Sequence, residues 1–274
     1  MMTQRDLAEQ LRALHRPSEP LVLVNAWDAA SARLVVVAGA RAVATTSAGM
    51  AFALGHPDGQ HISRADMLGA VAVVARAVEV PVTADMEAGY GDSPGDAAAT
   101  ARGVVGAGAV GLNVEDTAGD GGLLPVEQFL QKISAIRGVA DQTGVPLVLN
   151  ARVDVFLGEI GEPGTRLEHA IERGRAYREA GADCVFVPGV EDESTIGALV
   201  HGIGGCVSIL ATSRTPTVPE LGRLGVARVS MGSGPYRAAL TEALRIAGEA
   251  YGMGTFASLA AARITHEDAQ QLMS

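Results

Sequence analysis

The sequence predicts an α/β fold, a (β/α)₈ TIM barrel that carries an extra C-terminal helix. One observation is a repeated joint, in which a helical stretch closes on a glycine and runs straight into a short apolar strand, at Gly39, Gly108, Gly181 and Gly225. Glycine suits such a joint because the residue after a helix end often needs a positive φ. The other observation is the count of strands: eight short strands, each followed by a helical stretch, fill about 250 residues, as this barrel requires.

The strands lie between these joints and two Val-Pro connectors, in which proline ends a helix before a strand. The predicted strands are Leu21–Asn25, Ala42–Ser47, Val82–Asp85, Gly111–Glu115, Leu147–Arg152, Cys184–Val187, Cys206–Leu210 and Arg228–Ser230. Most are continuously apolar, which implies burial on both faces, as in a parallel sheet covered by helices. A doubly wound open sheet is the structural alternative. It is disfavoured because no glycine-rich dinucleotide fingerprint follows the first strand.

The strand pattern divides the chain into two parts. Residues 1–248 form the barrel, which we expect to be the catalytic domain. Residues 249–274 have no strand left to cover, so they are predicted to form a helical extension that packs on a neighbouring subunit. Helix starts inside the barrel are marked by capping pairs such as Ser63 with Asp66 and Thr165 with Glu168.

Composition excludes several classes of protein. The chain has 274 residues, of which 48% are hydrophobic and 19% charged, which is enough for a buried core and argues against a disordered chain. A net charge of −10 disfavours a nucleic-acid partner. No apolar run approaches the roughly 20 residues of a membrane span, and the N-terminus lacks a signal-peptide pattern, so a cytoplasmic protein is expected. Cys184 and Cys206 fall in predicted strands, where we expect inert buried side chains.

Polar residues gather where the predicted strands end, which is where active sites form in this fold. The most informative pair is Asp85 and Glu87, which are two residues apart and would point the same way in an extended backbone. Glu115 follows another strand. Carboxylates that converge in an apolar site repel one another, and a hard cation such as Mg²⁺ resolves that conflict. Arg152 could then hold the carboxylate of an anionic substrate through two hydrogen bonds.

Other polar residues have structural interpretations. Asp116 and Asp154 are expected to cap the helices that follow them. A structural ion pair is the alternative role for Arg152. His56 and His61 share a loop but lack a third zinc ligand. Lys132 is the only lysine and falls in a predicted helix, which argues against a Schiff-base aldolase. Reasoning from the residues therefore ends at a metal-assisted reaction on a small anionic acid, through an enolate.

Six stretches occur in the order seen in one known superfamily. They are Asn25–Arg33, Thr45–Ser47, Leu54–Gly59, Asp85–Gly91, Asn113–Asp116 and Asn150–Phe156. Over about residues 7–248 the chain resembles the isocitrate lyase/phosphoenolpyruvate mutase superfamily. The resemblance implies a (β/α)₈ barrel, Mg²⁺ (or Mn²⁺ in its place), and a C-terminal helix swapped in dimers that pair into tetramers. Members cleave or rearrange C–C or C–P bonds of oxo- and hydroxy-acids through a pyruvate-like enolate.

The resemblance also implies roles for the metal ligands. Asp85 is similar to the principal Mg²⁺ carboxylate of the family. Glu87 stands where the family usually has aspartate. Glu115 resembles the third acid, which often acts through water.

Substrate-binding roles are implied in the same way. Thr46, Ser47 and Ala48 occupy the loop whose backbone amides bind the substrate carboxylate or the enolate side. Asp58 matches an acid beside the metal-bound water, and Arg152 matches the arginine that holds the substrate anion. The expected partner is thus a small anionic oxo- or hydroxy-acid.

Two departures from the family bear on the reaction. The loop Thr117–Leu124 has none of the Cys, Lys, His or Asn residues that the family uses there, and Pro188-Gly189 replaces a Glu or His. The leading hypothesis is a Mg²⁺-dependent lyase that breaks a C–C bond of an oxo- or hydroxy-di- or tricarboxylate. The alternatives are C–P chemistry of the phosphoenolpyruvate mutase or phosphonopyruvate hydrolase type, and an oxoacid-binding protein with little catalysis.

Overall fold

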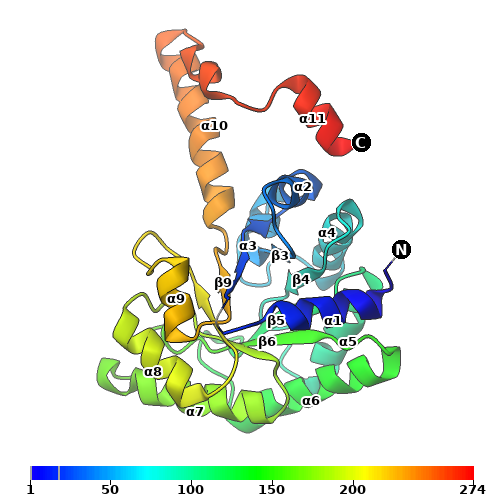
Figure 1. Ribbon diagram of the computed structural model, residues 1–274, viewed down its shortest axis with the longest axis vertical. Helices are drawn as coiled ribbons and strands as arrows, with labels where there is room; N and C mark the ends of the chain where they lie inside the picture. The colour runs from blue at the N-terminus through cyan, green and yellow to red at the C-terminus, as the bar shows by residue number, and fades with distance from the viewer. Residues whose placement is uncertain (1, 18) are drawn as a thin grey trace.

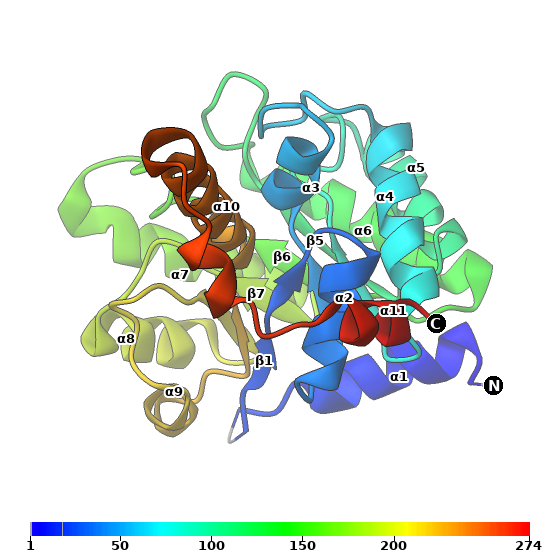
Figure 2. The ribbon, with the colours of Figure 1, turned by 90° about the horizontal axis from the view of Figure 1, so that it is seen from above.

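A ring of parallel strands forms the centre of the molecule (Figures 1 and 2). The computed structural model describes residues 2–17 and 19–274. Nine strands are found in these residues, and their order around the sheet is β1-β9-β8-β7-β6-β5-β4-β3-β2. Their bounds are β1 Leu21–Leu23, β2 Asn25–Ala26, β3 Val43–Thr45, β4 Val82–Asp85, β5 Gly111–Glu115, β6 Val148–Arg152, β7 Cys184–Phe186, β8 Val207–Leu210 and β9 Arg228–Ser230.

The two ends of this sheet belong to one segment of chain. β1 pairs with β9 and β2 pairs with β3, while only Val24 separates β1 from β2. The predicted strand Leu21–Asn25 therefore joins both edges and closes the ring. The (β/α)₈ barrel is confirmed, and β4, β5 and β9 have the predicted bounds.

Helices surround the ring and cover its N-terminal end. Their bounds are α1 Gln4–Leu14, α2 Ala29–Val37, α3 Ser47–Ala53, α4 Arg64–Ala77, α5 Pro94–Gly106, α6 Val126–Thr143, η1 Pro163–Thr165, α7 Arg166–Glu179, α8 Glu193–Ile203, α9 Val218–Leu224, α10 Gly234–Met253, η2 Ala257–Ala261 and α11 His266–Met273. A Cβ atom on Gly111, the first residue of β5, would lie 2.8 Å from the side chain of Leu11. α1 therefore packs directly against the start of the strands, and glycine makes that close approach sterically feasible.

Local sequence rules explain most helix ends. The glycine joints have positive φ, for example 104° at Gly39 and 111° at Gly181. Ser63 caps α4 as predicted, since its side chain accepts a hydrogen bond from the backbone of Asp66. Thr165 does not cap α7, because its hydroxyl donates instead to the carbonyl of Glu162, the residue before the short η1 helix.

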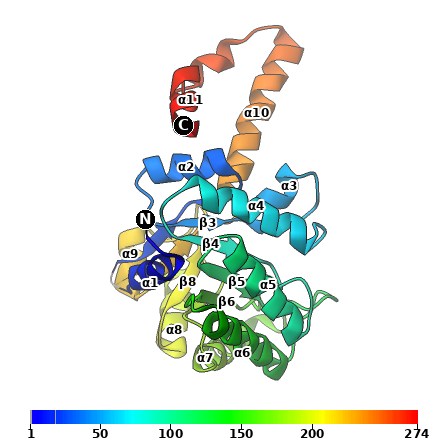
Figure 3. The ribbon, with the colours of Figure 1, turned by 90° about the vertical axis from the view of Figure 1, so that its right-hand side faces the viewer.

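The C-terminal region leaves the barrel as a long helix and then returns. α10 projects away from the ring, and α11 lies beside α2 (Figures 1 and 3). A hydrogen bond of 2.7 Å from Arg33 Nη1 to the carbonyl of Leu272 fixes this contact. The predicted boundary after residue 248 falls inside α10. Within the described ranges, no helix combines the length and apolar character that crossing a membrane would require.

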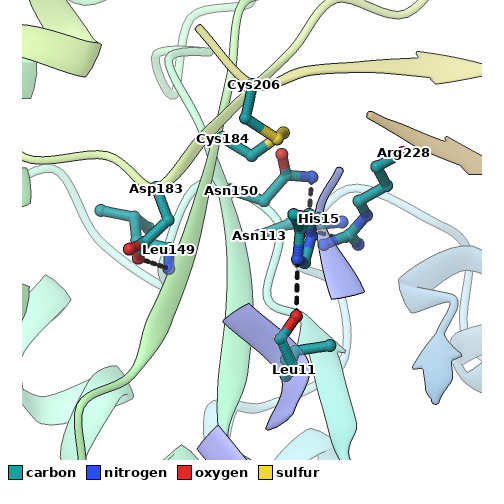
Figure 4. The surroundings of a disulfide bond; sticks show 9 residues. All are labelled: Leu11, His15, Asn113, Leu149, Asn150, Asp183, Cys184, Cys206 and Arg228. Carbon is teal, nitrogen blue, oxygen red and sulfur yellow. Dashed lines mark hydrogen bonds between the residues drawn. A yellow bond between two sulfur atoms is a disulfide. The ribbon is translucent and has the colours of Figure 1, made fainter. Parts of the chain in front are cut away.

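The two cysteines are paired, whereas inert buried side chains were expected. Cys184 and Cys206 form a disulfide, with their Cα atoms 4.6 Å apart (Figure 4). Cys184 begins β7, and Cys206 immediately precedes β8. Because β7 and β8 pair in parallel, with Val185 opposite Val207, the residues just before them are also neighbours. Strand order, which composition does not reveal, brings the thiols together.

Candidate active site

A small cavity lies at the carboxyl ends of the strands. Its volume is about 140 Å³. The predicted residues that line it are Thr46, Ser47, Ala48, Asp58, Asp85 and Arg152. The other lining residues are Asn25, Asn113, Leu157, Phe186, Pro188, Leu210, Ser230, Gly232 and Ser233. Glu87 and Glu115 are not part of this lining. The structure therefore brings six of the eight predicted site residues to one cavity.

Asp85 is held at the end of β4 by the segment that follows β3. Its Oδ2 accepts hydrogen bonds from the backbone N of Ser47 at 3.1 Å and from the Ser47 hydroxyl at 2.8 Å. Its own backbone N–H donates to Thr45 Oγ1 at 2.9 Å. Thr46 caps α3, because its Oγ1 accepts from Gly49 N. The Ser47 amide, which the resemblance assigned to substrate, thus binds a carboxylate of the protein itself.

Glu87 does not continue the direction of Asp85, so the prediction from strand alternation is wrong. β4 ends at Asp85, and Glu87 has a left-handed backbone with φ of 50°. The buried Glu87 carboxylate accepts from the backbone N of Gln60, and Tyr90 Oη donates to it at 3.4 Å. The turn after β4 therefore directs this acid toward the loop that carries Asp58.

Negative charge is concentrated between the three acids Asp58, Asp85 and Glu87. Burial, followed by the charges of Asp85 and Asp58, raises the pKa of Glu87 to about 7. Partial burial and the charge of Asp85 also raise the pKa of Asp58. The charge of Asp85 thus makes ionisation of Asp58 and Glu87 less favourable, which is the electrostatic condition that a bound cation relieves.

Arg152 is ion-paired on both sides. Its Nη1 lies 2.5 Å from Glu115 Oε2, and its Nε lies 2.6 Å from Asp154 Oδ1. Burial raises the pKa of Glu115. The positive charge of Arg152 lowers this pKa, but it only partly offsets the effect of burial, because Asp154 shares the same guanidinium. The structural ion pair considered for Arg152 is present, and the same guanidinium lines the cavity.

Asp116 and Asp154 have structural roles, but neither caps a helix as predicted. The fully buried Asp116 accepts from Arg173 Nη1 at 3.0 Å, from Tyr177 Oη at 2.6 Å and from the backbone N of Asp154 at 2.9 Å. Asp154 in turn accepts from Thr117 Oγ1 at 2.6 Å. These contacts tie the loops after β5 and β6 to α7, and so hold the segment that carries Arg152.

Two buried cations support the site without lining it. Lys132 Nζ donates to the carbonyls of Ala88 at 2.5 Å and Gly91 at 3.0 Å, which fixes the turn after β4. Arg228 is fully buried inside the barrel. The sequence pattern placed Lys132 on a helix and indicated no role for Arg228. A charged residue at the start of the short predicted strand Arg228–Ser230 could have indicated a buried contact.

The donor chemistry of the rim suits a hard cation. In residues 2–17 and 19–274, no three His, Cys, Asp or Glu side chains are arranged as a metal site. The acids that crowd the rim nevertheless offer only oxygen donors, and the charge of Asp85 contributes to the raised pKa values of Asp58 and Glu87. Mg²⁺ and Mn²⁺ prefer oxygen ligands, and their positive charge would reduce the repulsion between these carboxylates.

Comparison with known proteins identifies the family. The sequence profile of the phosphoenolpyruvate phosphomutase family matches residues 11–251. The chain belongs to this family, within the isocitrate lyase/phosphoenolpyruvate mutase superfamily. The superfamily resemblance drawn from the motifs is confirmed.

The chain is also similar to individual proteins of differing description. The chain is 36% identical to an uncharacterised protein of Mycobacterium tuberculosis (strain ATCC 25618 / H37Rv) over 235 residues, which cover 85% of this chain and 86% of that protein. It is 31% identical over 205 residues to an oxaloacetate decarboxylase of Rhodopseudomonas palustris (strain BisB18). These residues cover 72% of this chain and 68% of that protein. A protein of Burkholderia cenocepacia J2315, whose crystal structure is described as that of a lyase/mutase, is 38% identical. The two structures match with a TM-score of 0.90 over 98% of this chain and 95% of that protein.

Proposed function

We propose that this member of the phosphomutase family is a Mg²⁺-dependent lyase. Its substrate is a small oxo- or hydroxy-di- or tricarboxylate, whose C–C bond it cleaves through a pyruvate-like enolate. The observation that carries the proposal is the cavity that Asp58, Asp85 and Arg152 line together. A cavity of about 140 Å³ is smaller than the roughly 300–1,000 Å³ of typical ligand pockets, which favours a small acid.

Different residues would bind the cation and the substrate. Asp85 and Glu87 would hold Mg²⁺, with Glu115 acting through water and Asp58 beside it. When bound, the ion would supply stabilisation of the negative charge that develops on the enolate oxygen. Arg152 would bind the substrate carboxylate, and the segment Thr46–Ala48 would orient its enolate side. Phe186, Leu157 and Pro188 supply the apolar part of the wall, which limits access of water.

A second cavity supports a substrate larger than pyruvate. It has a volume of about 570 Å³ and shares Leu210, Gly232 and Ser233 with the first cavity. Arg237 also lines it. The part of the substrate beyond the reacting carbons, including a further carboxylate, would extend toward Arg237.

The proposal is tested by assaying the purified protein with a panel of acids. The panel contains oxaloacetate, methylisocitrate, dimethylmalate and isocitrate, each with Mg²⁺ or with EDTA. We expect release of pyruvate or another oxoacid from at least one of them, in the presence of Mg²⁺ only. Absence of turnover across the panel under both conditions would contradict the proposal.

Two other functions are distinguished by the same protein sample. C–P chemistry is favoured by the name of the matching family, and release of phosphate from phosphonopyruvate would select it. We expect little release, because the loop Thr117–Leu124 has no lysine or asparagine. An oxoacid-binding protein is favoured by the glycines of that loop and by Pro188 in the cavity wall. Tight binding of an oxoacid without turnover would select this function.

Replacing Arg152 by lysine should weaken oxoacid binding by about 1–3 kcal/mol, the scale of a hydrogen bond to a charged group. Lysine keeps the positive charge but loses the planar fork of five N–H donors, with which the guanidinium can contact both carboxylates and a ligand. Calorimetric titration of oxaloacetate or pyruvate at saturating Mg²⁺ measures the loss. Equal affinities together with a lowered melting temperature would show that Arg152 serves only its ion pairs with Glu115 and Asp154.

The C-terminal region suggests a homo-oligomer. α10 and the segment after it expose large apolar side chains, with Leu244 74%, Tyr251 93% and Phe256 70% accessible. We propose that a second copy of the chain covers them, in a dimer that pairs into a tetramer. Leu244→Glu should shift the mass measured by light scattering toward the monomer, whereas Glu242→Gln on the same helix should leave it unchanged. A monomeric wild-type protein at micromolar concentration would contradict this assembly.

A further inference from the structure

Asn113 lies in the wall of the cavity and also faces the inside of the barrel. Its Oδ1 accepts two hydrogen bonds, from Arg228 Nη2 at 3.1 Å and from Asn150 Nδ2 at 2.9 Å (Figure 4). Neither Arg228 nor Asn150 is part of the cavity lining. Asn113 is therefore the link between a buried polar network and the proposed substrate site.

The chemistry of arginine fixes which way the Asn113 amide faces. A guanidinium has only N–H donors, so the Asn113 atom that meets Arg228 must be the carbonyl oxygen. Burial lowers the pKa of Arg228 to about 10, which leaves it protonated at neutral pH. The contact with Asn113 is the one side-chain hydrogen bond of Arg228 within the described ranges, since its Nε and Nη1 are buried without a partner there. Flipping the Asn113 amide would place N–H against N–H and remove that bond.

The Nδ2 group of Asn113 consequently faces the cavity. The Asn113 side chain makes its hydrogen bonds through Oδ1 alone in the part of the chain that the structure describes, and the residue lines the cavity. In the sheet, Asn113 pairs with Asp85 on β4 and with Asn150 on β6, whose last residue is Arg152. A ligand that spans from Asp85 to Arg152 would therefore lie over this amide.

We infer that Asn113 is a substrate-binding residue, whose Nδ2 donates a hydrogen bond to an oxygen of the bound oxoacid and whose orientation is set by the buried Arg228. This inference rests on the proposed function, because it takes an anionic oxoacid as the ligand. Asparagine suits the position because it provides a donor without adding a charge to the acidic rim. Arg228 acts as a positioning residue, since it contacts Asn113 and does not line the cavity.

Two substitutions of Asn113 test the Nδ2 donor that faces the cavity while retaining an oxygen acceptor in the side chain. Asn113→Asp keeps an oxygen that accepts from Arg228 and Asn150, and replaces the N–H groups that face the cavity with a second oxygen. Asn113→Ser adds no charge, retains an oxygen, and is too short to reach a ligand. Thr83→Val is the matched control, because Thr83 is buried in β4 and is not part of the cavity lining.

Oxalate, a planar dianion that resembles the enolate of pyruvate, is titrated by calorimetry into each protein at saturating Mg²⁺. We expect the dissociation constant to rise about 10- to 100-fold in both Asn113 variants, the range for a lost hydrogen bond to a charged group. Thr83→Val should stay within about twofold of wild type. Melting temperatures establish that each variant is folded. A folded Asn113 variant that binds oxalate as wild type does would overturn the inference while leaving the proposed function standing. No binding by wild type would overturn both.

Discussion

Asp85→Ala is expected to abolish Mg²⁺ dependence and to lower turnover at least about 10³-fold, while the melting temperature changes by only a few degrees. The loss in rate corresponds to several kcal/mol of charge stabilisation that a bound cation contributes. The fold should tolerate the change, because Asp85 lies at the rim and its side-chain hydrogen bonds are the two from Ser47. Removing its charge also relieves Glu87, whose pKa Asp85 raises.

Activity and thermal unfolding are measured on the same preparation. Asp141→Ala, which removes an exposed carboxylate on α6 at the opposite end of the barrel, is the control and should retain wild-type turnover. If Asp85→Ala keeps its activity, the metal assignment is wrong. If it is inactive only because it unfolds, Asp85→Asn, which preserves the shape of the side chain, decides between the two causes.

Arg173→Met is expected to destabilise the protein by about 3–5 kcal/mol, the cost of removing one partner from a buried ion pair. It leaves the carboxylate of Asp116, which has no accessible surface, without its cation. It also removes the hydrogen bonds from Arg173 to the carbonyl of Leu124 at 3.0 and 3.1 Å. Urea denaturation at neutral pH measures the change in the free energy of unfolding.

Arg175→Met is the matched control on the same helix. Arg175 is exposed and donates only to the carbonyl of Gly202, so this change should cost no more than about 1 kcal/mol. A loss for Arg173→Met that is no larger than this control would show that the Asp116 network contributes little to stability.

The barrel could be predicted from sequence because its strands are marked locally. Continuous apolar runs between a glycine joint and a polar strand end gave bounds within one or two residues for most strands. Interactions between strands are not marked in this way. The pairing of Cys184 with Cys206 depends on β7 lying beside β8, and the closure at Val24 depends on β9 reaching β1.

In the candidate site, too, local features could be predicted and long-range contacts could not. Strand ends identified Thr46, Ser47, Asp85 and Arg152 as site residues, and the family resemblance added Ala48 and Asp58; all six line the cavity. The direction of Glu87 was mispredicted, since a left-handed turn replaces the extended backbone after Asp85. The roles of Asp116 and Arg228 depend on partners 57 and 115 residues away along the chain, which no local pattern indicates.

The most direct test of the proposed site is a crystal structure of the protein grown with Mn²⁺ and oxalate. We predict an anomalous peak for Mn²⁺ beside the carboxylates of Asp85 and Glu87, with oxalate between the metal and the guanidinium of Arg152. A structure in which Mn²⁺ and oxalate are absent from this cavity, or lie elsewhere on the protein, would contradict the assignment of the rim as an oxoacid site.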